Sequence, residues 1–284
     1  MNTLTSIVIA FLVISIIMYV WLTFKWRKQV KNEQQLRAEA EASKQQIIVE
    51  QTRNRQLKQE MTNNIAHELK TPVSSIRGYL EILMGDKPVT DEQRKYFIER
   101  CYNQTLRLSD LINDVSLINK LEEAEDLFNR EPVNLRAQAE EAILELQPKA
   151  EQHDITITDE LPTDLIVNGN SQLLYSIFRN LIENALEYAG DNISVGIRCY
   201  KPADDTHYFI HFYDTGKGVS NEYLPKLFDR FLRIDEGRSR KRGGTGLGLS
   251  IVKHAVLFHG GDIYVKNREN GGLEFFFSLQ RHTA

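Results

Sequence analysis

The sequence predicts a multidomain protein, in which an N-terminal transmembrane helix precedes a helical-hairpin domain and an α+β two-layer sandwich domain. Three observations predict this organisation. An uncharged apolar run occupies residues 4–24, apolar side chains recur at helical spacing from residue 57 to 118, and short strand-like runs alternate with helical ones beyond residue 130. The expected parts are a transmembrane anchor at 1–25, a helical stalk at 26–60, a hairpin domain at 61–122 and the sandwich domain at 130–284.

The composition argues against two classes of protein. A formal net charge of -4 lacks the basic surplus that is typical of nucleic-acid-binding proteins, so we expect no direct nucleic-acid partner. The two cysteines, Cys101 and Cys199, provide neither a disulfide framework nor the clustered spacing of a metal site.

The apolar run at 4–24 is long enough, at about 20 residues, to cross the hydrocarbon core of a bilayer as a helix. A cleaved signal peptide is the alternative, but the run has no basic start and no small-residue cleavage site. Four basic residues follow the run at once: Lys25, Arg27, Lys28 and Lys31. Because positive flanks stay on the cytoplasmic side, we expect a single-pass protein of the inner (cytoplasmic) membrane with its other domains in the cytoplasm.

The predicted stalk favours a continuous helix. Residues 27–60 are rich in Gln, Glu, Lys, Arg and Ala and contain neither Gly nor Pro. Their apolar positions are too sparse for a heptad assignment, so a solvated helix and a coiled coil both remain open.

The hairpin is predicted by two amphipathic helices. The apolar seam of the first consists of Leu57, Met61, Ile65, Leu69, Val73, Ile76, Leu80 and Leu83. Residues 85–88 (Gly-Asp-Lys-Pro) break this helix, and Thr90 to Gln93 read as a capping box that begins the second. The second seam consists of Phe97, Cys101, Leu108, Leu111, Val115 and Ile118. A lone hairpin buries little surface, so we expect a homodimer whose two hairpins form a four-helix bundle.

The sandwich domain is predicted by mixed patterns beyond Pro132. Asn134 is expected to cap a helix that runs to about His153, and a long helix is expected from Ser171 to Tyr188. Strands are expected at 155–157, 165–167, 193–200, 208–212, 262–265 and 273–279, with helices between the last two pairs. Helices that cover one face of a mostly antiparallel sheet make a two-layer sandwich.

The first hairpin helix carries a candidate phosphoryl acceptor. His67 points away from the apolar seam into solvent, and a neutral imidazole nitrogen is a suitable nucleophile near neutral pH. Glu68 can accept the imidazole proton or hold its tautomer, and Thr71 lies one turn further along the same face. Pro72 predicts a bend just past this site. An inert surface histidine is the alternative interpretation.

The string His67-Glu68-Leu69-Lys70-Thr71-Pro72 closely resembles the dimerisation and phosphotransfer segment of bacterial sensor histidine kinases of two-component systems. The resemblance implies that His67 accepts the γ-phosphoryl group of ATP and that Glu68 assists. It implies that Thr71 supports phosphatase action on the partner. That partner would be the receiver domain of a response regulator, which takes the phosphoryl group on an aspartate.

Three further segments predict a nucleotide site. Asn180 and Asn184 lie four residues apart on one helix face, and amide oxygens suit a Mg²⁺ ion that phosphates and water also ligate. Asp214 ends a strand before Gly216 and Gly218, and its carboxylate can accept the exocyclic amine of adenine. A surface amide pair and a simple Asp-Gly turn are the alternatives.

The third segment is rich in glycine. Residues 243–248 lead into a helix, so their backbone amides can face phosphate oxygens. Neither a Walker nor a Rossmann context surrounds them. The preceding basic run, 233–242, is expected either as a mobile lid over the nucleotide or as an exposed charged loop.

In their order and spacing these segments resemble the Bergerat-type ATP-binding domain of histidine kinases. The resemblance implies ATP and Mg²⁺, with Asn184 as the chief Mg²⁺ ligand, Asn180 in support and Arg233 as a γ-phosphate contact. One departure is Glu187, where members often carry a basic residue near the phosphates. The expected nucleotide-binding residues are Asn180, Asn184, Tyr188, Asp214, Gly216, Gly218, Gly244, Thr245, Gly246, Leu247, Gly248 and Leu249.

The resemblance therefore favours a membrane-anchored, homodimeric kinase that autophosphorylates on His67 and passes the phosphoryl group to a response regulator, which it also dephosphorylates. An ATPase of the gyrase-like or chaperone-like type is one rival. Those proteins place a glutamate base where Asn180 stands, which weakens this rival. A non-kinase scaffold or phosphatase that retains the fold is the other rival.

Overall fold

The computed structural model describes residues 3–123, 128–200, 206–234 and 244–282. Side chains of the first helix are described from residue 12 onward, apart from those at 13, 30, 32–40, 42, 54 and 57. The chain separates into two compact units, residues 1–63 and 64–284.

Helix α1 (Thr3–Met84) supplies all of the first unit that the structure describes. The predicted continuous helix over 27–60 is confirmed. Across the described residues, no helix combines the length and the apolar character needed to cross a membrane. The predicted transmembrane run begins at residues 4–11, whose side chains lie outside the described part.

The hairpin in the second unit joins the end of α1 to helix α2 (Asp91–Glu123). The predicted break after Met84 and the predicted capping box are both confirmed. The Thr90 N–H donates to Gln93 Oε1 over 3.1 Å, and the Gln93 N–H donates to Thr90 Oγ1 over 3.2 Å. Helix α1 runs through Pro72 without interruption, and Pro72 itself is buried.

Side chains between the two hairpin helices form a narrow apolar interface. The rings of Tyr79 and Phe97 stack with centroids 5.6 Å apart, and Leu111 is buried. Val73 and Leu80, which the sequence placed in the buried seam, are instead 51% and 44% exposed. Two helices can cover only one side of each other, so the apolar residues outside that contact stay uncovered in a single chain.

The larger sheet of the second unit has five strands in the order β2-β4-β5-β7-β6. Its strands are β2 (Thr156–Asp159), β4 (Ser194–Cys199), β5 (His207–Asp214), β6 (Ile263–Asn267) and β7 (Leu273–Gln280). Only β2 and β4 pair in parallel; the other neighbours are antiparallel, as the sequence predicted. A small second sheet pairs β1 (Glu131–Asn134) with β3 (Ile166–Gly169).

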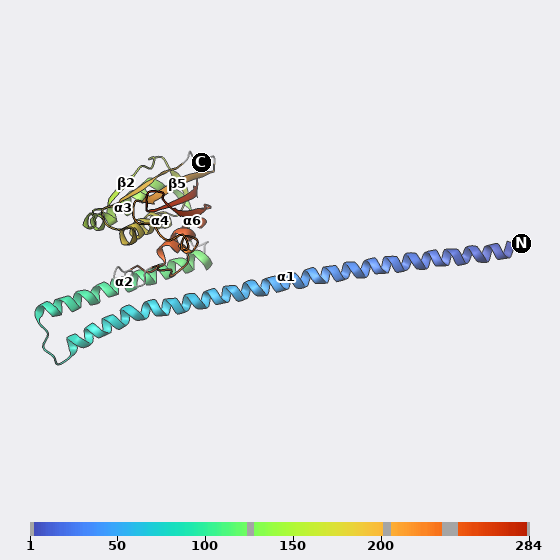
Figure 1. The fold of residues 1–284 in the computed structure, drawn as a ribbon, viewed down its shortest axis with the longest axis horizontal. Helices are drawn as coiled ribbons and strands as arrows, with labels where there is room; N and C mark the ends of the chain where they lie inside the picture. Colours follow the sequence, from blue (N-terminus) through green and yellow to red (C-terminus); the bar gives the residue numbers. More distant parts are fainter. Residues whose placement is uncertain (1–2, 124–127, 201–205, 235–243, 283–284) are drawn as a thin grey trace. The chain divides into compact units, whose positions relative to one another are not determined.

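Three helices cover one face of this sheet, which confirms the two-layer α+β sandwich (Figure 1). They are α3 (Leu135–Gln152), α4 (Ser171–Asn184) and α6 (Gly248–Phe258). Asn134 caps α3 as predicted, because its side-chain oxygen accepts the Ala137 N–H over 3.1 Å. The core lies between the layers, where the rings of Phe178 in α4 and Phe277 in β7 are 6.3 Å apart and both fully buried.

The structure corrects two expectations in this domain. The sequence predicted that the long helix continues to Tyr188, but α4 ends at Asn184 and residues Ala185–Ala189 form a π-helical turn, η2. A π turn inserts one extra residue per turn and redirects the side chains that follow it. The sequence also placed a helix between the last two strands, whereas a tight turn joins β6 to β7. In that turn Gly271 and Gly272 have φ angles of 91° and 96°, which favour glycine.

A buried histidine links the end of α6 to the start of α4. The His259 ring is completely buried; its Nδ1 donates to the Ala255 carbonyl over 2.6 Å, and its Nε2 accepts the Asn170 N–H over 3.1 Å. Asn170 is itself the N-cap of α4. These contacts fix a neutral tautomer, and burial lowers the pKa of His259 from 6.5 to about 4.

The buried neutral imidazole predicts acid sensitivity. Between pH 7 and pH 5 the unfolded state takes up a proton on His259 while the folded state resists it, so the free energy of unfolding should fall by about 2 kcal/mol more in wild type than in His259→Gln. Urea denaturation at the two pH values measures this. In His282→Gln, which alters an exposed position, the free energy of unfolding should fall as much between the two pH values as it does in wild type. An equal fall in the free energy of unfolding for His259→Gln and wild type would contradict a buried neutral His259.

Candidate functional site

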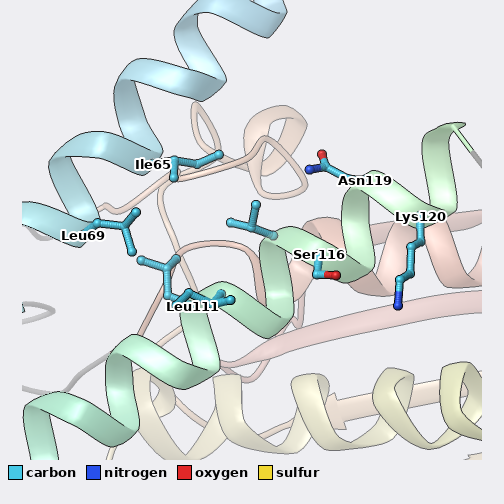
Figure 2. A pocket seen from close by; sticks show the side chains of 8 residues that line it. Ile65, Leu69, Leu111, Ser116, Asn119 and Lys120 are labelled. Atoms are coloured by element: carbon cyan, nitrogen blue, oxygen red, sulfur yellow. The ribbon is translucent and has the colours of Figure 1, made fainter.

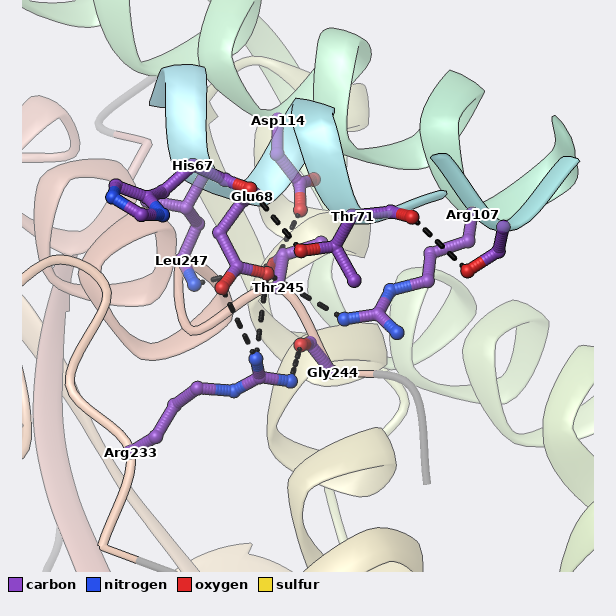
Figure 3. A network of polar contacts seen from close by, with 10 residues as sticks. His67, Glu68, Thr71, Arg107, Asp114, Arg233, Gly244, Thr245 and Leu247 are labelled. Atoms are coloured by element: carbon purple, nitrogen blue, oxygen red, sulfur yellow. Dashed lines mark hydrogen bonds and ion pairs between the residues drawn. The ribbon is translucent and has the colours of Figure 1, made fainter. Parts of the chain in front are cut away.

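The predicted phosphoacceptor segment lies on α1 within the second unit, with His67 exposed to solvent as the sequence predicted (Figure 3). The Thr71 hydroxyl donates to the His67 backbone carbonyl over 3.3 Å, so in this arrangement it caps its own helix turn. Glu68 is half-buried and points toward α2 and the sandwich domain. His67 therefore faces open solvent, and its acidic neighbour faces the protein.

Two arginines from different elements hold Glu68. The Arg233 Nη1 lies 3.3 Å from each Glu68 carboxylate oxygen, and the Arg107 Nη2 of α2 lies 3.5 Å from Oε2. The other terminal nitrogen of Arg233 donates to the Gly244 carbonyl. Burial, followed by the nearby charge of Arg233, lowers the pKa of Arg107. Arg233 thus connects the acidic residue of the hairpin to the glycine-rich segment.

A second polar contact joins the hairpin to the same segment. The Thr245 hydroxyl donates to Asp114 Oδ2 of α2 over 2.9 Å and accepts the Leu247 N–H over 3.2 Å. Burial raises the pKa of Asp114 to about 6. The glycine-rich segment is therefore tied to α2 by one hydrogen bond and to α1 through Arg233.

Asn180, the first asparagine of the α4 pair, faces the glycine-rich segment. Asn180 donates its amide to the Ser176 carbonyl over 2.8 Å, and its Oδ1 faces Gly248, the first residue of α6. A Cβ at Gly248 would lie only 2.7 Å from that oxygen, which explains a glycine at this position. Asn184 is the half-buried last residue of α4.

The π turn brings two side chains to Gly244. A Cβ added there would lie 2.5 Å from the Tyr188 hydroxyl and 2.8 Å from Glu187 Oε2. Burial raises the pKa of Tyr188, and the negative charge of Glu187 adds to that effect. Tyr188 therefore lies against Gly244, and Asn180 lies against Gly248 at the start of α6.

Asp214 occupies the other end of the candidate site, at the last position of β5. It is buried; its Oδ1 accepts the Gly216 N–H over 2.8 Å and its Oδ2 accepts the Leu273 N–H over 3.2 Å. Burial raises the pKa of this carboxyl. Each carboxylate oxygen keeps a further lone pair, so the group can still accept a hydrogen bond from a base.

At the remaining predicted glycines, neighbouring atoms lie too close to leave room for a side chain, or the backbone has a positive φ. Gly216 lies against Ala189 of η2, where a Cβ would collide with the Ala189 carbonyl, and Gly218 follows in the same loop. Gly246 has a φ of 73°, and Leu247 is buried just before α6. Leu249 packs against the core. Most of the predicted basic lid at 233–242, from residue 235 onward, lies outside the described part of the chain.

The residues present fit a nucleotide better than a metal held by protein alone. Among the described residues, no group of three His, Cys, Asp or Glu side chains could hold a metal ion. An adenine nucleotide suits this site. Asp214 offers a buried acceptor for the base, side chains approach the backbone of Gly244 and Gly248 closely, and the amide oxygens of α4 could share a Mg²⁺ ion with the phosphates.

Comparison with known families agrees with this geometry. Residues 57–124 match the His Kinase A (phospho-acceptor) domain, and residues 169–283 match the family of histidine kinase-, DNA gyrase B- and HSP90-like ATPases. The chain belongs to the sensor histidine kinases. It is 32% identical to the sensor histidine kinase WalK of Bacillus subtilis and 32% identical to the sensor-like histidine kinase SenX3 of Mycolicibacterium smegmatis.

Each of these matches covers 82% of this kinase chain, but only 38% of WalK and 60% of SenX3. Solved structures agree in fold. Acinetobacter baumannii histidine kinase AdeS aligns with a TM-score of 0.61 at 22% identity, over 76% of this chain and 98% of AdeS. Histidine kinase ThkA, solved in complex with response regulator protein TrrA, aligns with a TM-score of 0.61 at 24% identity, over 78% of this chain and 61% of ThkA.

Sequence reasoning missed two residues that the structure brings to this candidate site, Arg107 and Asp114. Both lie on the apolar face of α2, in the series Arg107, Leu111, Asp114 and Ile118 at spacings of four, three and four. Charged side chains within an apolar stripe are the signal that could have identified them, because burial of a charge requires a partner.

We predict that Asp214→Asn weakens ATP binding about tenfold. The asparagine has one acceptor oxygen in place of two, so its NH₂ faces either the adenine amine or the N–H of Gly216 or Leu273, and the lost hydrogen bond of the amine to a charged acceptor costs about 1–3 kcal/mol. Calorimetric titration with ATP measures the affinity, and a melting curve verifies that the variant is folded. Asp262→Asn, at an exposed position, is the control. Unchanged ATP affinity in folded Asp214→Asn would remove Asp214 from the site.

Proposed function

We propose that this chain is the kinase portion of a membrane-anchored homodimer, which phosphorylates His67 from ATP and transfers the phosphoryl group to an aspartate of a response regulator. The observation that supports this most directly is the position of Glu68. It adjoins the exposed His67, and Arg233 links it to Gly244 of the glycine-rich segment. Acceptor, acid and phosphate-binding backbone therefore belong to one compact unit.

In the proposed reaction an imidazole nitrogen of His67 forms a P–N bond as the bond from the γ-phosphorus to the bridging oxygen breaks, and ADP leaves. Glu68 holds the imidazole proton or tautomer during attack. Arg233 would move from Glu68 toward the developing charge on the γ-phosphoryl group, while Arg107 keeps Glu68 paired. Catalysis then consists mainly of positioning and neutralisation of charge.

The proposed nucleotide site places adenine at Asp214 and the phosphates at the start of α6. Asn184, with Asn180 in support, would hold Mg²⁺, which neutralises phosphate charge when bound. The sequence-predicted residues at 216–218 and 244–249 would form the walls by their backbone. An amide at Asn180, in place of a carboxylate, gives water no general base, which favours phosphoryl transfer to His67 over ATP hydrolysis.

The proposed partner is the receiver domain of a response regulator, and ThkA was solved in complex with response regulator protein TrrA. The exposure of His67 leaves room for such a domain. Thr71 lies one turn away and would position water during dephosphorylation of the regulator. Loss of regulator dephosphorylation in Thr71→Ala, with autophosphorylation retained, tests this part, and equal dephosphorylation in both proteins would contradict it.

ATP that is radiolabelled in its γ-phosphoryl group should label the wild-type protein with an acid-labile, base-stable phosphoryl group. His67→Ala should abolish this label, because it removes the imidazole nitrogen that accepts the phosphoryl group, whereas the exposed-site control His282→Ala should keep it. Adding a receiver domain should move the label to that domain. A persistent label in His67→Ala would reject His67 as the acceptor.

The uncovered face of the hairpin supports the proposed homodimer. Ile98, Tyr102 and Leu106 recur every four residues along α2 and are 55%, 63% and 47% exposed. A cavity of about 500 Å³ opens on the hairpin (Figure 2). It is lined by Ile65, Leu69, Leu111, Ile112, Val115, Ser116, Asn119 and Lys120. A second hairpin would cover these apolar surfaces and complete a four-helix bundle.

The double variant Leu80→Glu, Ile98→Glu should therefore weaken dimerisation, because it places four like charges in the bundle interface of the dimer. Light scattering of the full chain in detergent should show a dimer for wild type and at least a tenfold higher dissociation constant for the variant. Leu144→Glu, which alters an apolar residue 74% exposed on α3, is the matched control. A variant as dimeric as wild type would place the interface elsewhere.

The proposed anchor is the segment at 1–25. Its described apolar side chains include Ile17, Trp21 and Phe24, which are 62%, 58% and 69% exposed along α1, and a bilayer would cover them. Recovery of the full chain in the soluble fraction after cell lysis would contradict the anchor.

A further inference from the structure

The Lys149–Glu187 ion pair lies at the phosphate end of the proposed nucleotide site. Glu187 belongs to the π turn η2, and its carboxylate has two different neighbours. Oε2 abuts Gly244, as the position of an added Cβ shows, and Oε1 lies 3.4 Å from the Nζ of Lys149 in the last turn of α3. One carboxylate therefore contacts both the glycine-rich segment and a lysine of another helix.

A carboxylate is an unfavourable neighbour for phosphates. The Glu187 side chain is only 14% exposed, so water screens its charge poorly. Burial raises the pKa of Glu187, and Lys149, Arg233 and Arg107 oppose that rise, in that order. Phosphate oxygens held by amides near Gly244 would meet this negative charge unless a cation offsets it.

Lys149 is the cation of the sandwich domain that forms an ion pair with Glu187. Arg107 belongs to α2 and contacts Glu68, and Arg233 contacts Glu68 and the Gly244 carbonyl. Lys149 acts also on Glu183, one turn before Glu187, and opposes the burial that raises the pKa of that carboxyl. Helix α3 packs on α4 in the core, so the lysine stem has a fixed base.

We propose that Glu187 places a negative charge beside the phosphate chain and that Lys149 is the positioning residue that neutralises it. The Lys149–Glu187 pair thereby sets the affinity of the site for nucleotide phosphates. Adenine recognition at Asp214 is independent of the pair. The inference rests on the proposed ATP site and adds a determinant from α3, outside the segments that the sequence assigned to nucleotide binding.

The test is a double-mutant cycle of binding by the full chain in detergent, with ATP and adenosine as probes. Lys149→Met should weaken ATP binding about tenfold, because it removes the cation that most strongly opposes the Glu187 charge. Adenosine affinity should be unchanged. Glu187→Gln should bind ATP at least as tightly as wild type, and adding Lys149→Met to Glu187→Gln should have little further effect. Added salt should reduce the loss, because Lys149 is 39% exposed.

Lys266→Met is the matched control. Lys266 pairs with Glu274 over 3.0 Å in the same domain, between β6 and β7, and lies outside the proposed site. Its removal should leave ATP affinity unchanged. An equal loss of ATP affinity on adding Lys149→Met to the wild-type and Glu187→Gln backgrounds would overturn the proposal that Lys149 neutralises Glu187. Unchanged ATP affinity on adding it to either background would overturn the same proposal. Failure of wild type to bind both ATP and adenosine would instead overturn the proposed function, and this inference with it.

Discussion

The packing of α4 onto the sheet is the constraint on which the rest of the site depends. Its apolar face is completely buried and consists of Leu173, Leu174, Ile177, Phe178, Leu181 and Ile182. A helix with one face buried must present the opposite face in a single orientation, so Asn180 faces α6 and the π turn carries Glu187 and Tyr188 to Gly244. Truncating one of these large side chains would cost about 2–5 kcal/mol and loosen that orientation.

Two buried polar groups hold the neighbouring elements around α4. His259 joins the end of α6 to the N-cap of α4, and Asp214 joins the end of β5 to the start of β7. Both accept backbone N–H groups in places that water does not reach, where an unpaired donor is costly. The proposed nucleotide site is therefore a junction of element ends, and its shape follows from the hydrogen bonds that close those ends.

Charge is distributed over this junction in linked pairs. Glu68 shares two arginines, Arg107 from the hairpin and Arg233 from the sandwich domain, while Glu187 is opposed chiefly by Lys149. Movement of Arg233 toward a phosphate would leave Glu68 with Arg107 and Glu187 with Lys149. This arrangement allows one cation to change partners without leaving either buried carboxylate alone, which is the costly state for a partly buried charge.

The sequence by itself determined the local structure: the capping box at Thr90, the cap at Asn134, the broken helix after Met84 and the exposed side of His67. Each depends on residues within one or two turns, where spacing and side-chain chemistry decide the outcome. Only the tertiary structure decided the π turn at Ala185–Ala189, the burial of His259, and the contacts of Arg107, Asp114 and Lys149. These depend on which elements meet. Helical spacing can show that Arg107 and Asp114 lie on an apolar stripe, but it does not show which distant residues they contact.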